Sequence, residues 1–219
     1  MARELASEWL GRVPYAEALE LQRKCAEGVR SGARGEVLLL LEHPPVVTLG
    51  RGHRPEHLLE DREALAARGV ELFAVARGGD ATWHGPGQLV GYPILDLAAR
   101  GRADAHRYLR DLEAALVQAA SALGVAARAI PGMTGVFADA SEPPRKLASL
   151  GVGLRGWVTS HGFALNVCPD LAGFACIVPC GLRGVAMSSL ARELGPAAPL
   201  DLWERAREAV AEAVLRRFA

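Results

Sequence analysis

The spacing of apolar residues predicts four helices along the chain. From position 14 to position 29 apolar side chains recur at helical spacing, and Gly32 follows as a stop. The longest pattern of this kind ends before Gly124, where glycine is a common helix terminator. The predicted helices span residues 14–29, 61–68, 104–123 and 200–218.

Short apolar runs between turn residues predict the strands of a covered sheet. Residues 37–41 form an uninterrupted apolar run between two glutamates, and a second run follows the proline pair at 44–45. The predicted strands span residues 36–42, 46–49, 70–76, 88–97, 125–129, 135–138, 146–154 and 157–167. Strands dominate the middle of the chain and helices its ends. We therefore expect an α+β fold, a two-layer α/β arrangement with a mixed β-sheet flanked by helices, formed by residues 1–219 as a single domain.

Composition excludes several classes of protein. The 25 basic and 25 acidic residues balance, so the chain lacks the positive field of a nucleic-acid binder. No apolar run is long enough to span a membrane and the first residues carry no signal region, so we expect a cytoplasmic protein without membrane contacts. The four cysteines, at positions 25, 168, 176 and 180, are expected as free thiols, because their spacing fits neither a disulfide framework nor a zinc site.

Lysine is rare in this chain. Lys24 and Lys146 are the only lysines among the 25 basic residues, and the others are arginines. Arginine stays protonated, whereas a buried lysine can exchange a proton in a reaction. Lys146 is therefore a candidate acid or base, although a compositional bias toward arginine would explain its rarity equally well. Lys24 lies on a predicted amphipathic helix and fits that second interpretation.

A glycine-rich segment at positions 77–88 separates two predicted strands. Its four glycines let the backbone approach a ligand closely and leave N–H groups able to donate. An elaborate hairpin would have the same composition. Because Arg77, Thr82, Trp83 and His84 occur in this one turn, a binding site is the favoured interpretation.

Two predicted strands carry further candidates. The first begins at Lys146 and continues through small and apolar residues, of which Ala148, Leu150 and Gly151 could form a slot for an alkyl chain. The second contains His161 next to a glycine. A buried, hydrogen-bonded histidine without a chemical role is the alternative at this position.

Cys180 is the candidate nucleophile. Pro179 fixes the approach of the chain and Gly181 permits a sharp turn, so the thiol is expected at the end of a strand. Cys176, within an apolar run, is instead expected as a small buried hydrophobic residue. A thiolate needs a nearby cation or base, and spacing alone does not choose between Lys146, His84 and His161 as that partner.

Four blocks resemble the octanoyl-[acyl-carrier-protein]:protein octanoyltransferases, also called the lipoate-protein ligase B family. They are RGGxxTWHGPGQL from position 77, KxASLG from 146, HGFALN from 161 and PCG from 179, in the family's order. The likeness covers positions 14–190. Ser160, where the family often has an aromatic residue, is a departure that bears on the width of the pocket and so on acyl chain length.

The resemblance implies a fold similar to the catalytic domains of biotin and lipoate ligases. It implies transfer of an octanoyl group from octanoyl-acyl carrier protein to a lysine of lipoyl domains, those of 2-oxoacid dehydrogenase complexes and of the glycine cleavage H protein, in endogenous lipoate biosynthesis. Cys180 would carry the group as a thioester, and Lys146 would lower the pKa of the thiol and handle protons. No metal, ATP or other cofactor is implied, because the acyl group arrives activated.

The matching positions also imply a set of substrate-binding residues. These are Arg77, Gly78, Gly79, Asp80, Ala81, Thr82, Trp83, His84, Ser149, Leu150, Gly151, His161, Gly162, Phe163 and Ala164. Three other functions remain as alternatives. An ATP-dependent lipoate or biotin ligase gives Cys180 no role, a cysteine-dependent acyl hydrolase would pair Cys180 with His161, and a noncatalytic acyl- or carrier-binding protein would not need the thiol.

Overall fold

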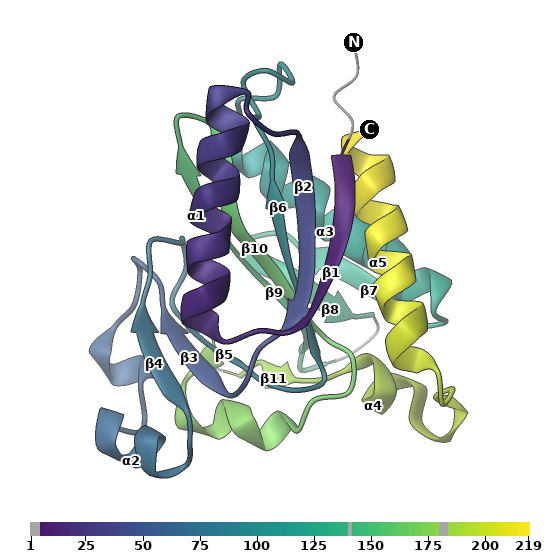
Figure 1. Cartoon of the computed structure of the whole chain (residues 1–219). Coiled ribbons are helices and arrows are strands. Elements are labelled where there is room, and N and C mark those ends of the chain that lie inside the picture. Colours follow the sequence, from purple (N-terminus) through teal and green to yellow (C-terminus); the bar gives the residue numbers. More distant parts are fainter. Residues whose placement is uncertain (1–4, 140–141, 180–183) are drawn as a thin grey trace.

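An eight-stranded mixed sheet forms the centre of the computed structural model, which describes residues 5–139, 142–179 and 184–219 (Figure 1). The strand order is β1-β2-β6-β10-β9-β8-β7, and β11 pairs with β9. The pairs β1/β2 and β9/β11 are parallel and the other pairs are antiparallel. The strands are β1 (Leu5–Arg12), β2 (Glu36–Glu42), β6 (Gln88–Ile94), β7 (Ala127–Ile130), β8 (Met133–Ala138), β9 (Arg145–Arg155), β10 (Val158–Asn166) and β11 (Ala186–Met187).

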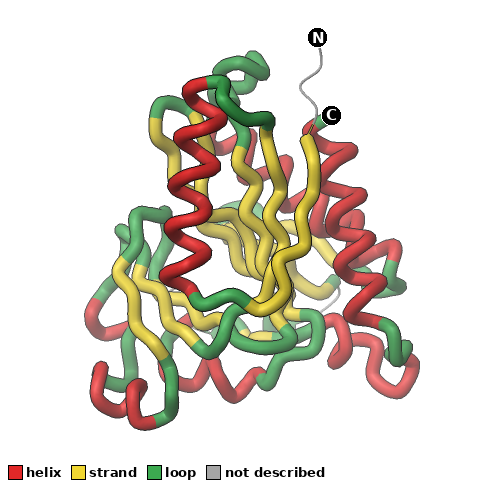
Figure 2. The backbone as a smooth tube through the Cα atoms, viewed as in Figure 1, coloured by secondary structure: helices red, strands yellow, loops and turns green. Residues whose placement is uncertain are grey.

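Helices cover both faces of this sheet. Helix α1 (Tyr15–Ser31) lies on one face, and α3 (Ala105–Ala122) and α5 (Leu202–Phe218) lie on the other (Figures 1 and 2). In β2, Leu39 belongs to the apolar cluster under α1, whereas its neighbours Leu38 and Leu40 belong to the cluster under α3 and α5. A strand that is buried on both faces has a continuous apolar sequence, which is the pattern of residues 37–41.

A small second sheet packs beside the first. It has the order β4-β3-β5, with β3 at Val46–Leu49, β4 at Glu71–Ala74 and β5 at Ala81–His84. Its apolar cluster includes residues of the 3₁₀ helix η2 (Leu171–Cys176). The remaining short elements are η1 (Pro55–His57), α2 (Arg62–Ala67), α4 (Leu190–Leu194) and η4 (Gly195–Ala197).

The predicted fold class, a mixed sheet flanked by helices, is confirmed. The four predicted helices correspond to α1, α2, α3 and α5, whose ends lie within two residues of the predicted ones, and β2 and β3 have the predicted bounds. Local signals explain this accuracy. Gly32 ends α1 with a φ of 75°, and the Asp104 carboxylate accepts hydrogen bonds from the N–H groups of His106 and Arg107 at the start of α3.

Four sequence-based expectations were wrong. Residues 36–42 and 46–49 belong to different sheets, because the chain crosses between them at the proline pair. The predicted buried strand 70–76 is the edge strand β4, which pairs only with β3 among the described strands and is partly exposed. Strands β1, β5 and β11 were missed. The chain before Pro179 is the 3₁₀ helix η2 followed by an isolated bridge at Ile177, not a strand.

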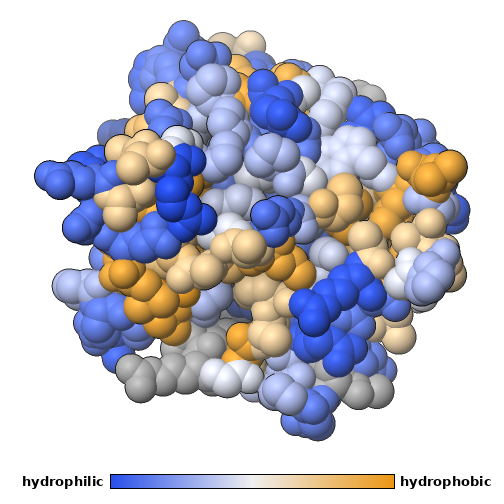
Figure 3. All heavy atoms as spheres, turned by 90° about the horizontal axis from the view of Figure 1, so that it is seen from below, coloured by the Kyte–Doolittle hydropathy of each residue, from blue (hydrophilic) through white to orange (hydrophobic). Residues whose placement is uncertain are grey.

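In the described part of the chain no helix is long and apolar enough to cross a membrane. Large exposed apolar side chains are scattered over different elements rather than gathered. They are Trp9, Leu59, Trp157 and Leu200. The face seen from below in Figure 3 likewise intersperses hydrophobic and hydrophilic residues. Single exposed apolar residues of this kind are ordinary and do not mark a docking surface.

Candidate active site

A cavity of about 250 Å³ lies where residues of both sheets meet, and most of the predicted binding residues line it. The pairing of β9 with β10 explains part of this convergence, because Ser149, Leu150 and Gly151 lie opposite Ala164, Phe163 and Gly162. The predicted residues at the cavity are Arg77, Gly79, Asp80, Thr82, His84, Ser149, Leu150, Gly151, His161, Gly162, Phe163 and Ala164.

Gly78, Ala81 and Trp83 do not line the cavity. Strand alternation accounts for the last two, since Thr82 and His84 of β5 face the cavity and the side chains between them point to the other side. There Trp83 packs on Phe174 with ring centroids 5.2 Å apart. Gly78 instead binds the main sheet, through its N–H to the carbonyl of Val152 at 2.9 Å.

Sequence reasoning missed five cavity residues: Tyr15, Tyr92, Gly132, Met133 and Thr134. Tyr92 stands in the apolar strand β6 and Tyr15 in the first turn of α1, where an aromatic residue usually indicates core. Gly132, Met133 and Thr134 lie at the turn into β8. Only the fold brings these separate segments together, so no local signal could have found them.

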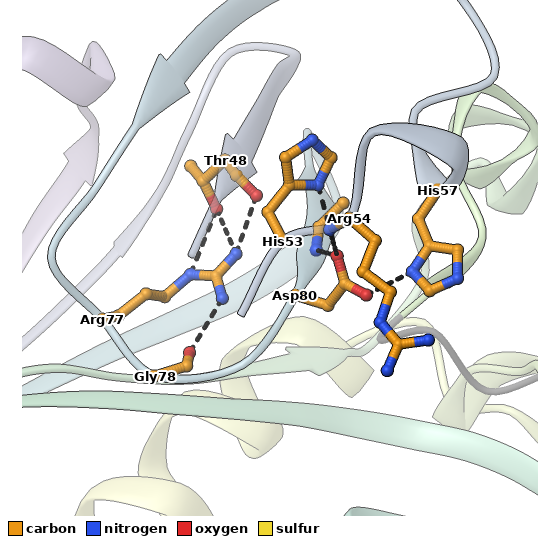
Figure 4. A network of polar contacts seen from close by, with 8 residues as sticks. Thr48, His53, Arg54, His57, Arg77, Gly78 and Asp80 are labelled. Atoms are coloured by element: carbon orange, nitrogen blue, oxygen red, sulfur yellow. Dashed lines mark hydrogen bonds and ion pairs between the residues drawn. The ribbon is translucent and has the colours of Figure 1, made fainter. Parts of the chain in front are cut away.

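Arg77 fixes the glycine-rich loop to the small sheet (Figure 4). It is buried, and its guanidinium donates to the hydroxyl and the carbonyl of Thr48 on β3, with the shortest bonds at 2.8 and 2.7 Å. The loop also packs tightly on β9. A methyl group at Gly151 would stand 2.9 Å from both the Arg77 Cδ and the Gly78 carbonyl oxygen, so this approach requires glycine.

Asp80 joins the loop to the segment that follows β3 (Figure 4). Its carboxylate accepts a hydrogen bond from His57 Nδ1 and lies 3.3 Å from His53 Nδ1, and it also accepts from the N–H of Ala81 at 2.7 Å. Burial acts to raise the pKa of Asp80. The hydrogen bonds outweigh that effect and lower the pKa below its usual value. Asp80 is therefore an anion at the cavity wall.

Three buried histidines near the cavity, His43, His84 and His161, are neutral at pH 7. Burial lowers the pKa of His43 and of His161 to about 4, and that of His84 to about 3. Hydrogen bonds define two tautomers. His43 donates from Nδ1 to the Val13 carbonyl at 2.7 Å and accepts from the Tyr92 hydroxyl at Nε2, while His84 donates from Nδ1 to Gln88 Oε1 at 2.6 Å.

A buried line of amides leads from His84 to the segment beside β9. Gln88, which accepts from His84, donates through Nε2 to Asn166 Oδ1 at 2.9 Å. Asn166 Nδ2 in turn donates to the Ser188 carbonyl at 2.8 Å, and the Ser188 N–H donates to the Lys146 carbonyl at 2.9 Å. These bonds fix the chain around β11 against the strand that carries Lys146.

Lys146 is buried behind the cavity, with 1% of its surface exposed. Its Nζ donates to the carbonyl of Thr134, a cavity residue, at 2.9 Å, and lies 5.5 Å from the centre of the Phe137 ring. Cys180, the predicted nucleophile, lies outside the described residues. Cys176 is buried, as predicted, and its Sγ donates to the Gly173 carbonyl at 3.2 Å.

Within the described ranges, no three His, Cys, Asp or Glu side chains form a group able to hold a metal ion. The titratable groups at or next to the cavity include buried Lys146, Asp80 and the neutral His84 and His161. The cavity wall combines these polar groups with the apolar side chains of Leu150, Phe163 and Ala164. Such a wall suits a ligand with an apolar body and one polar end.

Comparison with known proteins defines the class. The family described as the lipoyl protein ligase A/B catalytic domain matches residues 14–219. The fold agrees with solved structures of that class. A bi-partite lipoate protein ligase from Thermoplasma acidophilum superposes with a TM-score of 0.65 at 17% identity, covering 99% of this chain and 84% of the other. A lipoate-protein ligase A bound with ATP gives 0.69 at 16% identity, covering 99% and 85%.

Closer relatives narrow the class. The octanoyltransferase of Geobacter sulfurreducens is 53% identical over 188 residues, which are 86% of this chain and 75% of that one. The octanoyltransferase of Geobacter metallireducens is 51% identical over 191 residues, 87% and 84% of the two chains. The chain therefore belongs to the octanoyltransferase family, and its activity is the transfer of an octanoyl group.

Proposed function

We propose that the chain takes an octanoyl group from octanoyl-acyl carrier protein and delivers it to a lysine of a lipoyl domain, with Cys180 as an intermediate carrier. One observation supports this most directly: three sequence segments predicted to bind the acyl group line a single cavity, and Lys146 stands directly behind its wall. The acceptors proposed are the lipoyl domains of 2-oxoacid dehydrogenase complexes and the glycine cleavage H protein.

The size and lining of the cavity support an acyl ligand. A cavity of about 150 Å³ holds the six carbons of benzene, so a volume of about 250 Å³ suits a chain of eight carbons. The Thr82 hydroxyl is buried at this wall and has no hydrogen-bond partner among the described residues. A polar atom of a bound thioester or a water molecule would satisfy it.

The first proposed step moves the acyl group to the enzyme. The Cys180 thiolate attacks the carbonyl carbon of the donor thioester, a new C–S bond forms, and the carrier's sulfur leaves with a proton from the Lys146 ammonium. The position of Lys146 supports this role, because β11 pairs Met187 with Lys146 only three residues after the described chain resumes at Gly184. The neutral His84 and His161 carry no charge to stabilise a thiolate.

The second proposed step forms the amide. The acceptor lysine has an ordinary pKa of about 10.4, so it first gives one proton to solvent and reacts as the neutral amine. As this amine attacks the acyl-enzyme, its nitrogen loses a second proton to Lys146, which the first step left neutral, and the C–S bond breaks to release the Cys180 thiolate. Because one thioester replaces another before the amide forms, no ATP is needed.

Intact-protein mass spectrometry tests the scheme. The purified chain is mixed with octanoyl-acyl carrier protein without ATP, beside the variants Cys180→Ala and Lys146→Ala. We expect the wild type to gain one octanoyl group, Cys180→Ala to gain none, and Lys146→Ala to gain it at least about 100-fold more slowly, the usual size of a proton-transfer contribution.

The fate of the adduct separates the alternatives. Discharge to a purified lipoyl domain, with little loss in buffer alone, supports the transferase. Rapid loss to water in the absence of an acceptor would identify a cysteine hydrolase instead. An octanoyl group found on the lipoyl domain from octanoate and ATP, with no enzyme adduct, would identify a ligase of the ATP-dependent kind.

A further inference from the structure

We propose that Glu113 on α3 is a positioning residue that holds Lys146 in its ammonium form, acting across Gly135 of β8. This inference deepens the proposed function and rests on the catalytic role assigned there to Lys146. Glu113 was not a candidate in the sequence, where it occupies one position in a long amphipathic helix.

Gly135 brings the two side chains together. Its N–H donates to Glu113 Oε1 at 2.8 Å. On its other side a methyl group would stand 2.6 Å from the Lys146 Cε and 3.1 Å from Nζ, so the tip of the lysine lies against the bare Cα. A carboxylate and an ammonium thus contact the same residue of β8, and any side chain at position 135 would push the lysine away.

Burial makes this pair electrostatically strong. Glu113 and Lys146 are each 1% exposed. An ammonium removed from water tends to lose its proton unless a negative charge lies near it, and water screens little at this depth. The carboxylate supplies that charge from α3, through its contact with Gly135.

Two neighbouring groups favour the ionised form of Glu113 against the effect of burial. Oε1 accepts the Gly135 N–H, and the guanidinium of Arg110 lies 2.8 Å from Oε2 as an ion pair, although it is not aligned as a hydrogen bond. Burial raises the pKa of Glu113 above its usual value, and the Gly135 N–H, Arg110 and Lys146 offset part of that rise. A permanent cation beside Oε2 opposes protonation at that oxygen.

In the described part of the chain, the charged residues next to Lys146 on β9 and α4 pair with each other. Arg145, the preceding residue on β9, pairs with Glu193 on α4 at 2.7 Å. The Ser188 hydroxyl also donates to Glu193, at 2.5 Å. From β8, Lys146 meets the Thr134 carbonyl and the Phe137 ring, neither of which titrates. Among the described residues, Glu113 is thus a carboxylate placed to influence the protonation of Lys146.

A double-mutant cycle tests the interaction without any catalytic assay. Urea unfolding is measured for the wild type, Glu113→Gln, Lys146→Met and the double variant. Each single change removes one of the two buried charges beside Gly135 and leaves the other, whereas the double change removes both. If the two changes acted independently, their fold-increases in the equilibrium constant of unfolding would multiply. We expect the constant of the double variant to be about 10-fold lower than that product predicts. Additive effects would overturn the inference.

Should Glu113→Gln alone not fold, the double variant decides the same question. A folded double variant supports the proposal, because loss of the second charge restores balance. A double variant that is also unfolded assigns Glu113 a purely structural role at Gly135 and refutes the electrostatic one.

The pH profile of kcat/KM tests the catalytic consequence. Removing a neighbouring carboxylate lowers the pKa of a lysine, so the ammonium is lost at lower pH. We expect the alkaline limb of the profile of Glu113→Gln to lie about one pH unit lower than that of the wild type. At pH values above both limbs, kcat/KM of the variant should then be about 10-fold lower than that of the wild type. The matched control Glu193→Gln removes a carboxylate paired with Arg145 and should leave the limb in place. An unmoved limb in Glu113→Gln contradicts the proposal.

The two readouts also separate this inference from the proposed function. If Cys180 carries no acyl group, the proposed function fails while the stability cycle still reports on Glu113 and Lys146. If the acyl-enzyme forms but the cycle is additive, the transferase mechanism stands and Glu113 has no part in it.

Discussion

The polar residues around the cavity are buried in uncharged forms wherever their contacts allow it. His43, held between the Val13 carbonyl and the Tyr92 hydroxyl, needs one N–H and one lone pair, which only the neutral ring provides. Burial also raises the pKa of Tyr15 to about 12. Neutral rings keep the cost of desolvating this region small, and Arg77 and Asp80 carry charge at the cavity wall.

We predict that the stability of the protein falls as the pH drops from about 6.5 to about 4. His43, His84 and His161 have folded pKa values of about 4, 3 and 4, below the unfolded value of 6.5. The unfolded chain therefore binds more protons in this window. Stability is fully present above pH 6.5 and is lost by up to about 1.4 kcal/mol per pH unit for each histidine. Urea unfolding at pH 7, 6 and 5 measures this slope.

The variant His43→Gln provides the control, because an amide can both donate and accept but does not titrate. Titrating carboxylates such as Asp80 contribute equally to both proteins and cancel in the comparison. The slope of the variant should be smaller by up to one proton's contribution. Equal slopes would mean that His43 is not kept neutral by the fold.

Among the elements, β10 does most to assemble the site. Its middle, Gly162 to Ala164, lines the cavity, and its last residue, Asn166, binds Gln88 on β6 and the Ser188 carbonyl beyond β11. One strand thus orders both the predicted acyl wall and the chain that returns to Lys146. Asn166 is 1% exposed, so water cannot replace either bond.

We predict that Asn166→Ala lowers the free energy of unfolding by about 2–4 kcal/mol, because it removes the acceptor of one Gln88 N–H bond and the donor to the Ser188 carbonyl, both of them buried. Asn166→Asp keeps an acceptor for Gln88 and loses the donor to Ser188, so it separates the two bonds. Urea denaturation measures both variants. A loss below about 0.5 kcal/mol for Asn166→Ala would show that the two groups find other partners.

Local sequence signals predicted the elements far better than their assembly. Asp104 and Gly124 bound α3 through capping geometry that depends on a few neighbouring residues. The β5 strand was missed because its residues stand among glycines, and its partner β3 lies over thirty positions earlier in the chain. Glycine density marked the loop as a candidate site, yet the cavity residues Tyr15 and Thr134 belong to it only through tertiary contacts.

At the scale of the whole molecule, the site depends on how the two sheets are joined. The hydrogen bonds of Arg77 to Thr48 and of Gly78 to Val152 connect the small sheet, the glycine-rich loop and β9. The cavity lies at this junction, with walls from both sheets and from the start of α1. A ligand that fills it contacts all three parts at once, so binding is expected to stabilise the folded protein as a whole.

This gives a prediction about ligand length. A fatty acid that fills the cavity stabilises the folded state by about 2.7 kcal/mol at 100 times its dissociation constant. For a chain of this size that is a rise in melting temperature of about 5–10 °C. Thermal unfolding with butanoate, octanoate and hexadecanoate should show the largest rise for octanoate. The shortest chain buries too little apolar surface, and the longest exceeds a cavity of about 250 Å³.

The variant Ala164→Leu ties this effect to the cavity. Ala164 is a small residue of the wall, and a leucine there occupies space that the end of the acyl chain would fill. In this variant, octanoate should raise the melting temperature by little more than butanoate does. The increase caused by butanoate should be the same as in the wild type. Equal rises for all three chain lengths, or an unaltered response to octanoate in the variant, would mean that the acyl chain binds elsewhere on the molecule.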